Sequence, residues 1–190
     1  MNLEGILPFA RILLEKVVTD GSAAIDATVG NGHDTVFLAR LVGESGRVFG
    51  FDIQEQALTN TAARLEEQQL SDRVTLFDCG HEQAAAFIPG EWQKQLKGAI
   101  FNLGYLPRGD KSIVTKPDTT IAAVAQILSM LVPGGIIVLV IYHGHEEGTV
   151  EKEKLLNFVE NIDQHEAHVL RYEFINQTNN PPFIVAIEKR

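Results

Sequence analysis

Residues 25–34 read Ile-Asp-Ala-Thr-Val-Gly-Asn-Gly-His-Asp, and they carry the strongest structural signal in the sequence. A short apolar run ends at the carboxylate of Asp26, a Gly-x-Gly turn follows at Gly30 and Gly32, and a helical pattern begins directly afterwards. Such a turn exposes backbone N–H groups and lets a ligand approach a main chain that carries no Cβ. The stretch predicts a strand, a ligand-binding turn and a helix; a tight turn without a ligand is the alternative.

A second acid ends the next apolar run. Residues 48–51 are followed by Asp52, twenty residues after Gly32. An acid at this offset, at the tip of the neighbouring strand, is placed to bind both hydroxyls of a ribose. The two stretches together predict a site for an adenosine-containing cofactor.

The turn itself favours one cofactor over another. A dinucleotide fingerprint carries a third small residue, where this chain has the bulkier Thr35. A positively charged aminoacyl-sulfonium ligand suits a nearby carboxylate such as Asp26, whereas a pyrophosphate does not. We therefore expect S-adenosylmethionine in place of NAD. The residues expected to form its site are Asp26, Gly30, Asn31, Gly32, His33, Asp52, Gln54, Cys79, Gly80 and His81.

The order of elements indicates the architecture. Apolar runs predict strands at 23–26, 48–52, 74–78, 99–102 and 136–142. Helical spacing predicts helices at 33–42, 55–69, 82–87, 119–131 and 150–162, after an amphipathic helix within residues 1–19 in which Pro8 occupies the first turn or makes a kink. Strands this apolar, separated by helices, are typical of a parallel sheet covered on both faces.

The C-terminal part departs from this alternation. Two strand-like runs, 169–175 and 183–188, are separated by only seven residues, which is too few for a parallel crossover, so they must pair antiparallel. The whole order resembles the class I methyltransferase fold: α/β, Rossmann-like, with a seven-stranded, mostly parallel sheet and a C-terminal antiparallel hairpin. We expect a single domain over residues 1–190.

Composition narrows the class of protein further. The chain has 190 residues, 45% of them hydrophobic, which is typical of one globular domain. Its single cysteine, Cys79, excludes an intramolecular disulfide and suits a reducing compartment. The start lacks the basic region of a signal peptide, and the apolar run 136–142 is too short to cross a bilayer. We expect a cytoplasmic protein, with Cys79 as a small apolar residue.

The end of the fourth strand carries candidate amine-binding groups. Residues 102–107 read Asn-Leu-Gly-Tyr-Leu-Pro, similar to the [Asp/Asn/Ser]-Pro-Pro-[Tyr/Phe] signature of methyltransferases that act on exocyclic or primary amines, with Leu103 and Gly104 in place of the prolines. The Asn102 oxygen and the Leu103 carbonyl can accept both hydrogens of an amine, and Tyr105 can stack on the substrate. An ordinary strand-to-loop transition is the alternative.

Two more segments belong to the predicted rim of the sheet. Residues 180–183 read Asn-Pro-Pro-Phe and match the signature letter for letter, but they fall in the hairpin, so Asn180 is expected only to line the substrate pocket. His143 and His145 follow the fifth strand as candidate bases or hydrogen-bond partners. Capping of the next helix is their alternative role, and we expect no metal site because further ligands at a suitable spacing are lacking.

Five stretches together carry a family resemblance: residues 26–35, 50–54, 102–107, 142–146 and 176–183. They are similar to a bacterial family long labelled putative rRNA methylases, whose characterised members are tRNA 5-(aminomethyl)-2-thiouridine methyltransferases. The resemblance implies methyl transfer from S-adenosylmethionine to the primary amine of a modified wobble uridine, giving 5-methylaminomethyl-2-thiouridine. It also implies a homodimer.

The charge of the chain must be reconciled with an RNA substrate. A net charge of −9 argues against general nucleic-acid binding, because phosphate contacts need basic groups. Arg108, Lys111 and Lys116 nevertheless cluster beside the amine motif, where they could contact the phosphates of a tRNA anticodon loop. The alternatives are methylation of rRNA or of a small amine metabolite, or binding of an adenosine cofactor without catalysis.

Overall fold

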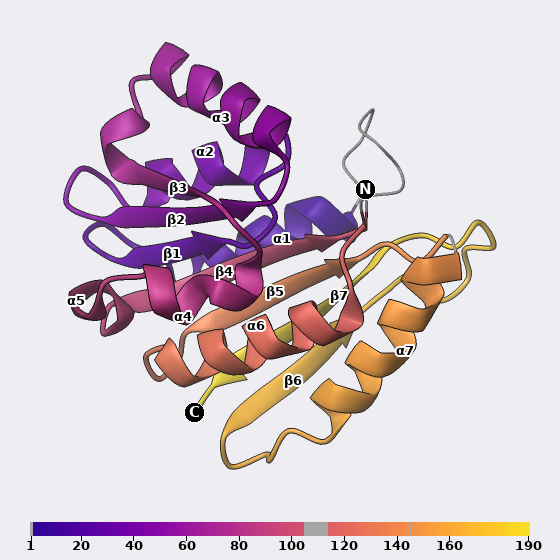
Figure 1. The fold of residues 1–190 in the computed structure, drawn as a ribbon. Helices are drawn as coiled ribbons and strands as arrows, with labels where there is room; N and C mark the ends of the chain where they lie inside the picture. Colours follow the sequence, from indigo (N-terminus) through magenta and orange to yellow (C-terminus); the bar gives the residue numbers. More distant parts are fainter. Residues whose placement is uncertain (1, 105–113, 145) are drawn as a thin grey trace.

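The computed structural model describes residues 2–104, 114–144 and 146–190, and these form one central sheet with helices on both faces (Figure 1). Within these residues the sheet has seven strands in the order β3-β2-β1-β4-β5-β7-β6. Their bounds are β1 Ala23–Asp26, β2 Arg47–Asp52, β3 Val74–Asp78, β4 Leu96–Leu103, β5 Ile136–Ile141, β6 Ala167–Tyr172 and β7 Phe183–Lys189. The first five strands pair in parallel, and β7 runs antiparallel to both of its neighbours.

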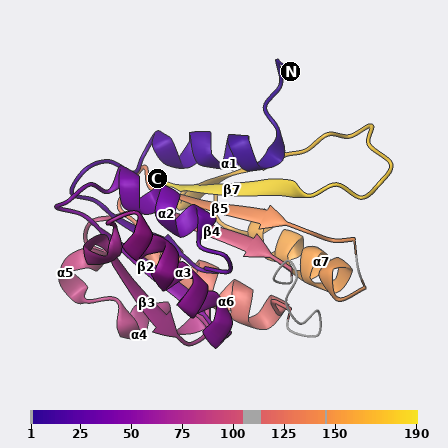
Figure 2. The same cartoon turned by 90° about the horizontal axis from the view of Figure 1, so that it is seen from above.

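The helices form two layers, one on each face of the sheet (Figure 2). Their bounds are α1 Ile6–Glu15, α2 His33–Leu41, α3 Glu55–Glu67, α4 Ala84–Phe87, α5 Gly90–Gln93, α6 Pro117–Met130 and α7 Glu146–Glu160, with short 3-10 turns at Ser71–Arg73 and His81–Gln83. Helices α1, α2 and α3 share one apolar core with the sheet, and α4, α6 and α7 share the other.

Strand β5 shows why both faces must be covered. All six of its residues are buried, and alternate residues point to opposite cores: Val138 and Val140 to the α1 side, Leu139 and Ile141 to the α6 side. An entirely apolar strand of this kind is stable only between two layers of helices.

The predicted fold is confirmed. Strands β1 and β3 begin and end where the apolar runs do, Pro8 lies in the first turn of α1, and the terminal hairpin is antiparallel. One connection differs: β6 ends at Tyr172, earlier than expected, so residues 173–182 join the two strands of the hairpin. Helix α5 was not predicted, because four residues are too few to show a helical period.

The topology fixes where a ligand can bind. The chain moves outward from β1 to β3 in one direction and from β4 to β5 in the other, so the order reverses between β1 and β4. In open α/β sheets, ligands bind at such a switch point, beyond the carboxyl ends of the strands. Asp26 ends β1, and Asn102 lies near the end of β4, which brings these two predicted site residues to the same place.

The length and apolar character of a helix decide whether it could span a membrane. Across the part of the chain that the structure describes, none of the helices is long and apolar enough to span a bilayer.

Candidate active site

The Gly-x-Gly turn after β1 needs both of its glycines. Gly30 and Gly32 have φ angles of 51° and 75°, a region that disfavours residues with a Cβ. A Cβ on Gly32 would also lie 2.6 Å from the Oγ1 atom of the buried Thr61 in α3. That same Oγ1 donates a hydrogen bond to the Gly30 carbonyl over 3.2 Å. The turn is therefore held closely against α3.

The helix after this turn presents its N-terminus to the site. Among the described residues, no side chain caps the start of α2, so its first N–H groups stay open to a ligand. Asn31 is half-buried in the turn, and His33 is exposed at the first helical position. The geometry suits the approach of a polar or anionic group.

Asp52, at the end of β2, joins the turn to the next helix. Its Oδ2 atom accepts from the Gly30 N–H at 2.8 Å, and its Oδ1 atom accepts from the Gln54 N–H at 2.9 Å. A carboxylate has about four lone-pair sites, so both oxygens can accept further hydrogen bonds. The partly buried Asp52 thus keeps the acceptors that a ribose diol needs.

His81, just after β3, is fixed by contacts with the segment after β1 and with β4. Its Nδ1 atom lies 3.0 Å from the carbonyl oxygen of Ala27, and its ring packs edge-on against Phe101. Burial lowers the pKa of His81, so the neutral ring donates from Nδ1 to that carbonyl. The buried Nε2 atom then remains an acceptor with no partner among the described residues, available to a donor such as the exocyclic amine of an adenine.

The neighbouring Cys79 directly follows Asp78, the last residue of β3. It is half-buried and packs against one of the two apolar cores. Burial, and then the carboxylates of Glu82 and Asp78, raise the pKa of its thiol, which keeps it protonated. Gly80, next to it, is half-buried and precedes the 3-10 turn.

Asp26 is fully buried beneath the turn. Its Oδ2 atom accepts from the Thr35 hydroxyl at 2.6 Å, and its Oδ1 atom accepts from the Thr28 N–H at 3.2 Å. Thr35 is thus the residue that replaces the third small position of a dinucleotide fingerprint, and its hydroxyl serves Asp26. Burial, and then the Asp34 carboxylate, raise the pKa of Asp26 to about 7. This acid changes charge near neutral pH.

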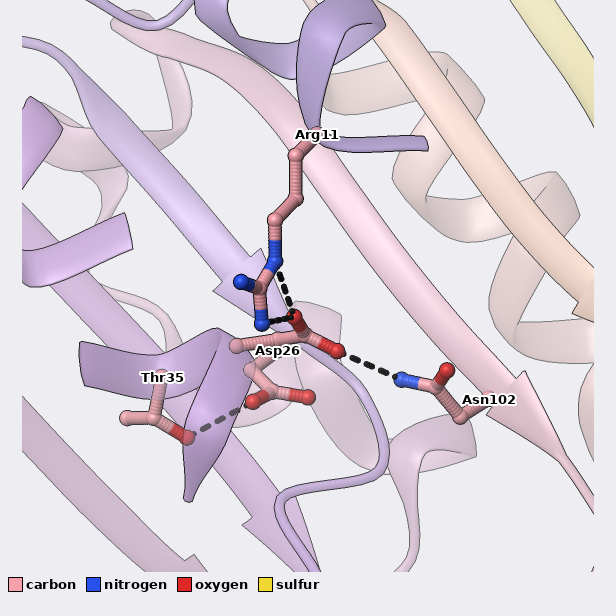
Figure 3. A network of polar contacts seen from close by, with 5 residues as sticks. Arg11, Asp26, Thr35 and Asn102 are labelled. Atoms are coloured by element: carbon pink, nitrogen blue, oxygen red, sulfur yellow. Dashed lines mark hydrogen bonds and ion pairs between the residues drawn. The ribbon is translucent and has the colours of Figure 1, made fainter. Parts of the chain in front are cut away.

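Three side chains from distant parts of the chain form a network above Asp26 (Figure 3). Arg11 of α1 donates from Nε and Nη2 to Oδ1 of Asp34, over 3.2 and 2.9 Å. The other oxygen of Asp34 accepts from Nδ2 of Asn102 at 3.0 Å. The backbone N–H of Asn102 donates to the Thr28 hydroxyl at 2.7 Å, which ties the end of β4 to the segment after β1.

The segment after Asn102 explains the departure from the amine signature. Gly104 has a φ of 148°, whereas a proline ring fixes φ near −65°, so proline cannot occupy this position. Gly104 also pairs with Thr115: its N–H donates to the Thr115 hydroxyl at 3.0 Å, and its carbonyl accepts the Thr115 N–H at 3.1 Å. The Leu103 carbonyl accepts from the Tyr142 N–H at 3.2 Å, so only its second lone pair can serve a substrate.

A buried acid supports this segment from below. Glu151 of α7 is 2% exposed, and its two oxygens accept hydroxyl hydrogens from Thr115 at 2.6 Å and Thr120 at 2.7 Å. The contacts join α7, α6 and the segment after β4.

Further candidate site residues lie directly after β5 and in the connection between β6 and β7. His143 is half-buried, and its ring centroid lies 5.5 Å from that of Phe183, so the start of β7 meets the segment after β5. Burial, and then the charge of Lys152, lower the pKa of His143, which favours a neutral ring. Asn180, in the connection between β6 and β7, is exposed, with a φ of 48°. Tyr142 is 38% exposed, and burial, and then the Asp34 carboxylate, raise the pKa of its phenol, which keeps it protonated.

Several predicted residues lie outside the described part of the chain: Tyr105, Arg108, Lys111 and His145. Lys116 is described, directly before α6. Within the described ranges, no three acids, histidines or cysteines are arranged to hold a metal ion.

Four residues of this site were not assigned from the sequence: Arg11, Asp34, Tyr142 and Glu151. Asp34 belongs to the stretch 25–34, and its place at the start of a helix was a usable signal. Arg11 is the only basic residue of α1. This makes it stand out in the sequence but does not indicate which residue it binds.

The strand order, the glycine turn and the acids at the strand ends define a class I, S-adenosylmethionine-dependent methyltransferase. The family to which the chain belongs is a narrower group within this class. Residues 48–188 match the model of the family described as "Putative rRNA methylase", and the chain belongs to this family, which confirms the resemblance seen in its motifs.

Relatives of known structure and name agree with this assignment. A crystal structure of a putative rRNA methylase from Clostridium thermocellum is 47% identical, with a TM-score of 0.96 over the full length of both chains. A putative methyltransferase from Streptococcus mutans, solved in complex with SAH, is 39% identical, with a TM-score of 0.89 over 99% of each chain. The chloroplastic tRNA (mnm5s2U34)-methyltransferase of Arabidopsis thaliana is 32% identical over 95% of this chain and 68% of its own length.

Proposed function

We propose that this protein methylates the primary amine of 5-aminomethyl-2-thiouridine at the wobble position of tRNA, giving 5-methylaminomethyl-2-thiouridine. The observation that supports an amine substrate is the orientation of Asn102. A carboxylate can only accept hydrogen bonds, so the amide nitrogen of Asn102, which is the donor, faces Asp34. The amide oxygen then points away from Asp34, where it can accept a hydrogen from an amine (Figure 3).

The residues present fit the cofactor of this class. The glycine turn admits a ligand close to the backbone, Asp52 keeps acceptors for a ribose, and the orphaned Nε2 of His81 can accept from an adenine amine. S-adenosylmethionine, when bound, supplies an electrophilic methyl group. Asp26, fully buried beneath the turn, shapes the pocket around the cationic aminoacyl end through its contacts with Thr28 and Thr35.

The substrate amine must lose a proton before it can react. Alkyl amines are mostly protonated at neutral pH, as a lysine with a pKa of about 10.4 is. His143 is a candidate acceptor, because its lowered pKa keeps a ring nitrogen free of a proton. His145 is the second candidate. Asn102 and the Leu103 carbonyl orient the amine, and Tyr105 stacks on the base; positioning of this kind supplies a large part of the rate.

RNA binding by an acidic protein needs local basic groups. Arg108, Lys111 and Lys116 are proposed to contact phosphates of the anticodon loop, whose unpaired bases can stack on aromatic side chains. Tyr142, partly exposed directly after β5, is a further stacking candidate. Asn180 at the hairpin tip would contact the substrate from the other side. A cytoplasmic homodimer, which offers a larger contact surface to the RNA, completes the proposal.

Ribosomal RNA is the second candidate substrate, and the family description favours it. The experiment is transfer of labelled methyl groups from S-adenosylmethionine to three substrates: tRNA that carries the aminomethyl group, tRNA that lacks it, and ribosomal RNA. Labelling of the first alone, with the methylated nucleoside identified by mass spectrometry, is the expected result. Equal labelling of both tRNAs, or labelling of ribosomal RNA, would reject the aminomethyl substrate.

A variant pair tests the role of Asn102. Asn102→Ala should lower kcat by about 100-fold and leave cofactor affinity within a few-fold, because the contact matters most in the transition state. Asn157→Ala, at an exposed position of α7, is the matched control. Turnover of Asn102→Ala within a few-fold of the wild type would show that Asn102 does not orient the amine.

A further inference from the structure

We infer that the Arg11–Asp34 ion pair is a positioning device that decides which atom of the Asn102 amide faces the substrate, and thereby selects a hydrogen-bond donor such as an amine. This inference rests on the proposed function. It assigns a role in the reaction to α1, a helix that precedes the first strand of the sheet.

The two ends of an amide side chain are nearly identical in shape but opposite in hydrogen bonding. With its oxygen outward, Asn102 accepts from an amine; with its nitrogen outward, it could bind the amine only through the lone pair that has to attack the methyl group. Its orientation is set by Asp34, which accepts from Nδ2 at 3.0 Å. The choice between a donor and an acceptor substrate therefore depends on the group at position 34.

Arg11 determines which oxygen of Asp34 remains available to Asn102. Both donating nitrogens of Arg11, Nε and Nη2, are directed at the same atom, Oδ1 of Asp34. The other oxygen is left for Asn102. The Asp34 side chain is 14% exposed and that of Arg11 41%, so the shared carboxylate lies mainly away from solvent, where water substitutes poorly for these partners.

Because of this arrangement, we expect the isosteric change Asp34→Asn to reduce activity strongly. In Asp34→Asn, the guanidinium still requires an acceptor, so the new amide must turn its oxygen to Arg11 and its nitrogen to Asn102. Asn102 must then reverse to accept from that nitrogen, which aims its own NH2 group at the substrate. That NH2 group can bind only the lone pair of the amine, which then cannot attack the methyl group, and we expect kcat for methyl transfer to fall by about 100-fold, similar to the loss of one directed hydrogen bond in an active site.

Removing the guanidinium should restore part of this loss. In the double variant Arg11→Met/Asp34→Asn, the new amide is free to turn its oxygen to Asn102, and the Asn102 oxygen can again face the amine. Methionine keeps an unbranched apolar stem near the Phe37 ring, over which the guanidinium carbon lies at 5.2 Å. We expect the double variant to be at least tenfold faster than Asp34→Asn alone. Arg11→Met by itself leaves a carboxylate that still orients Asn102, and it should lose only a few-fold.

The test compares the wild type, both single variants and the double variant in kcat, KM for aminomethyl-bearing tRNA, SAH affinity and thermal midpoint. Asp118→Asn, which removes an exposed ion pair with Lys154, is the control for loss of a surface carboxylate. A merely structural role for the ion pair predicts additive losses, with the double variant slowest. A double variant no faster than Asp34→Asn overturns the inference.

A second measurement does not depend on turnover. The side-chain amide protons of Asn102 should show nuclear Overhauser contacts to the β protons of Asp34 in the wild type, and these contacts should disappear in Asp34→Asn and return in the double variant. Unchanged contacts in Asp34→Asn overturn the inference even if activity falls. A wild type that fails to label aminomethyl tRNA refutes the proposed function instead, and the amide contacts then decide the positioning role alone.

Discussion

The buried carboxyl of Asp26 should make the stability of this protein depend on pH in the direction opposite to that of an ordinary surface acid. Burial and the neighbouring Asp34 raise its pKa from 3.8 to about 7. The folded state therefore binds a proton between about pH 4 and pH 7 that the unfolded chain has already lost. Stability contributed by this group is complete below pH 4 and is lost as the pH rises through 7.

The size of the effect follows from the pKa difference. Each pKa unit corresponds to about 1.4 kcal/mol, so the full difference amounts to roughly 4 kcal/mol, of which about 2–3 kcal/mol falls between pH 5 and pH 8. Asp26→Asn removes the titration but keeps the shape. The amide oxygen can accept from the Thr28 N–H, and the amide nitrogen can donate to the Thr35 hydroxyl once that hydroxyl rotates.

The assay is urea unfolding of the wild type and of Asp26→Asn at pH 5, 6, 7 and 8. The free energy of unfolding of the variant, relative to the wild type, should increase by about 2–3 kcal/mol from pH 5 to pH 8. Asp118→Asn, at a highly exposed carboxylate, should show no such trend. A difference between Asp26→Asn and the wild type that stays constant with pH would refute the reasoning.

Three further predictions concern Asp52 beside the turn, Gly104 after β4, and the basic residues Arg108 and Lys111. Asp52→Ala should weaken binding of SAH by about 10- to 100-fold in calorimetric titration, because charge-assisted hydrogen bonds to a ribose are lost, and unchanged affinity in a folded variant would contradict this. Gly104→Ala should lower the free energy of unfolding by about 1–3 kcal/mol in urea, since a φ of 148° strains any residue with a Cβ, and wild-type stability would show that the segment adapts. Replacing Arg108 and Lys111 together by alanine should raise KM for tRNA and flatten its dependence on salt; an unchanged salt slope would place the phosphate contacts elsewhere.

The sequence predicted the central part of the sheet well, because its strands are short apolar runs that end at charged or polar residues. Asp26, Asp52 and Asp78 each close a strand, and an acid following a buried run is a sharp boundary. Strand β6 lacks such a boundary. It lies at the edge of the sheet, where the neighbouring apolar residues Val169 and Leu170 are 40% and 47% exposed, so apolar residues do not mark where this strand begins and ends.

The placement of the candidate site residues could be predicted where it depends on strand ends, but not where it depends on tertiary contact. Asp26, Asp52 and Asn102 were assigned because the carboxyl ends of parallel strands meet at one edge. Arg11 was not, because amphipathic spacing indicates which face of α1 is buried and does not specify a partner 23 positions away. The supporting role of Glu151 depends on the packing of α7 against α6, which a periodic pattern also does not reveal.

The position of β7 has a consequence for synthesis of the protein on the ribosome. Strand β7 follows β6 in the chain but lies between β5 and β6 in the sheet, so β6 cannot take its final place until residues 183–189 have emerged. Until then, one edge of the wholly buried β5 has no neighbour and presents unpaired backbone groups beside apolar side chains. A nascent chain that stalls before Phe183 therefore leaves this apolar edge open to aggregation, and insertion of β7 is the step that covers it.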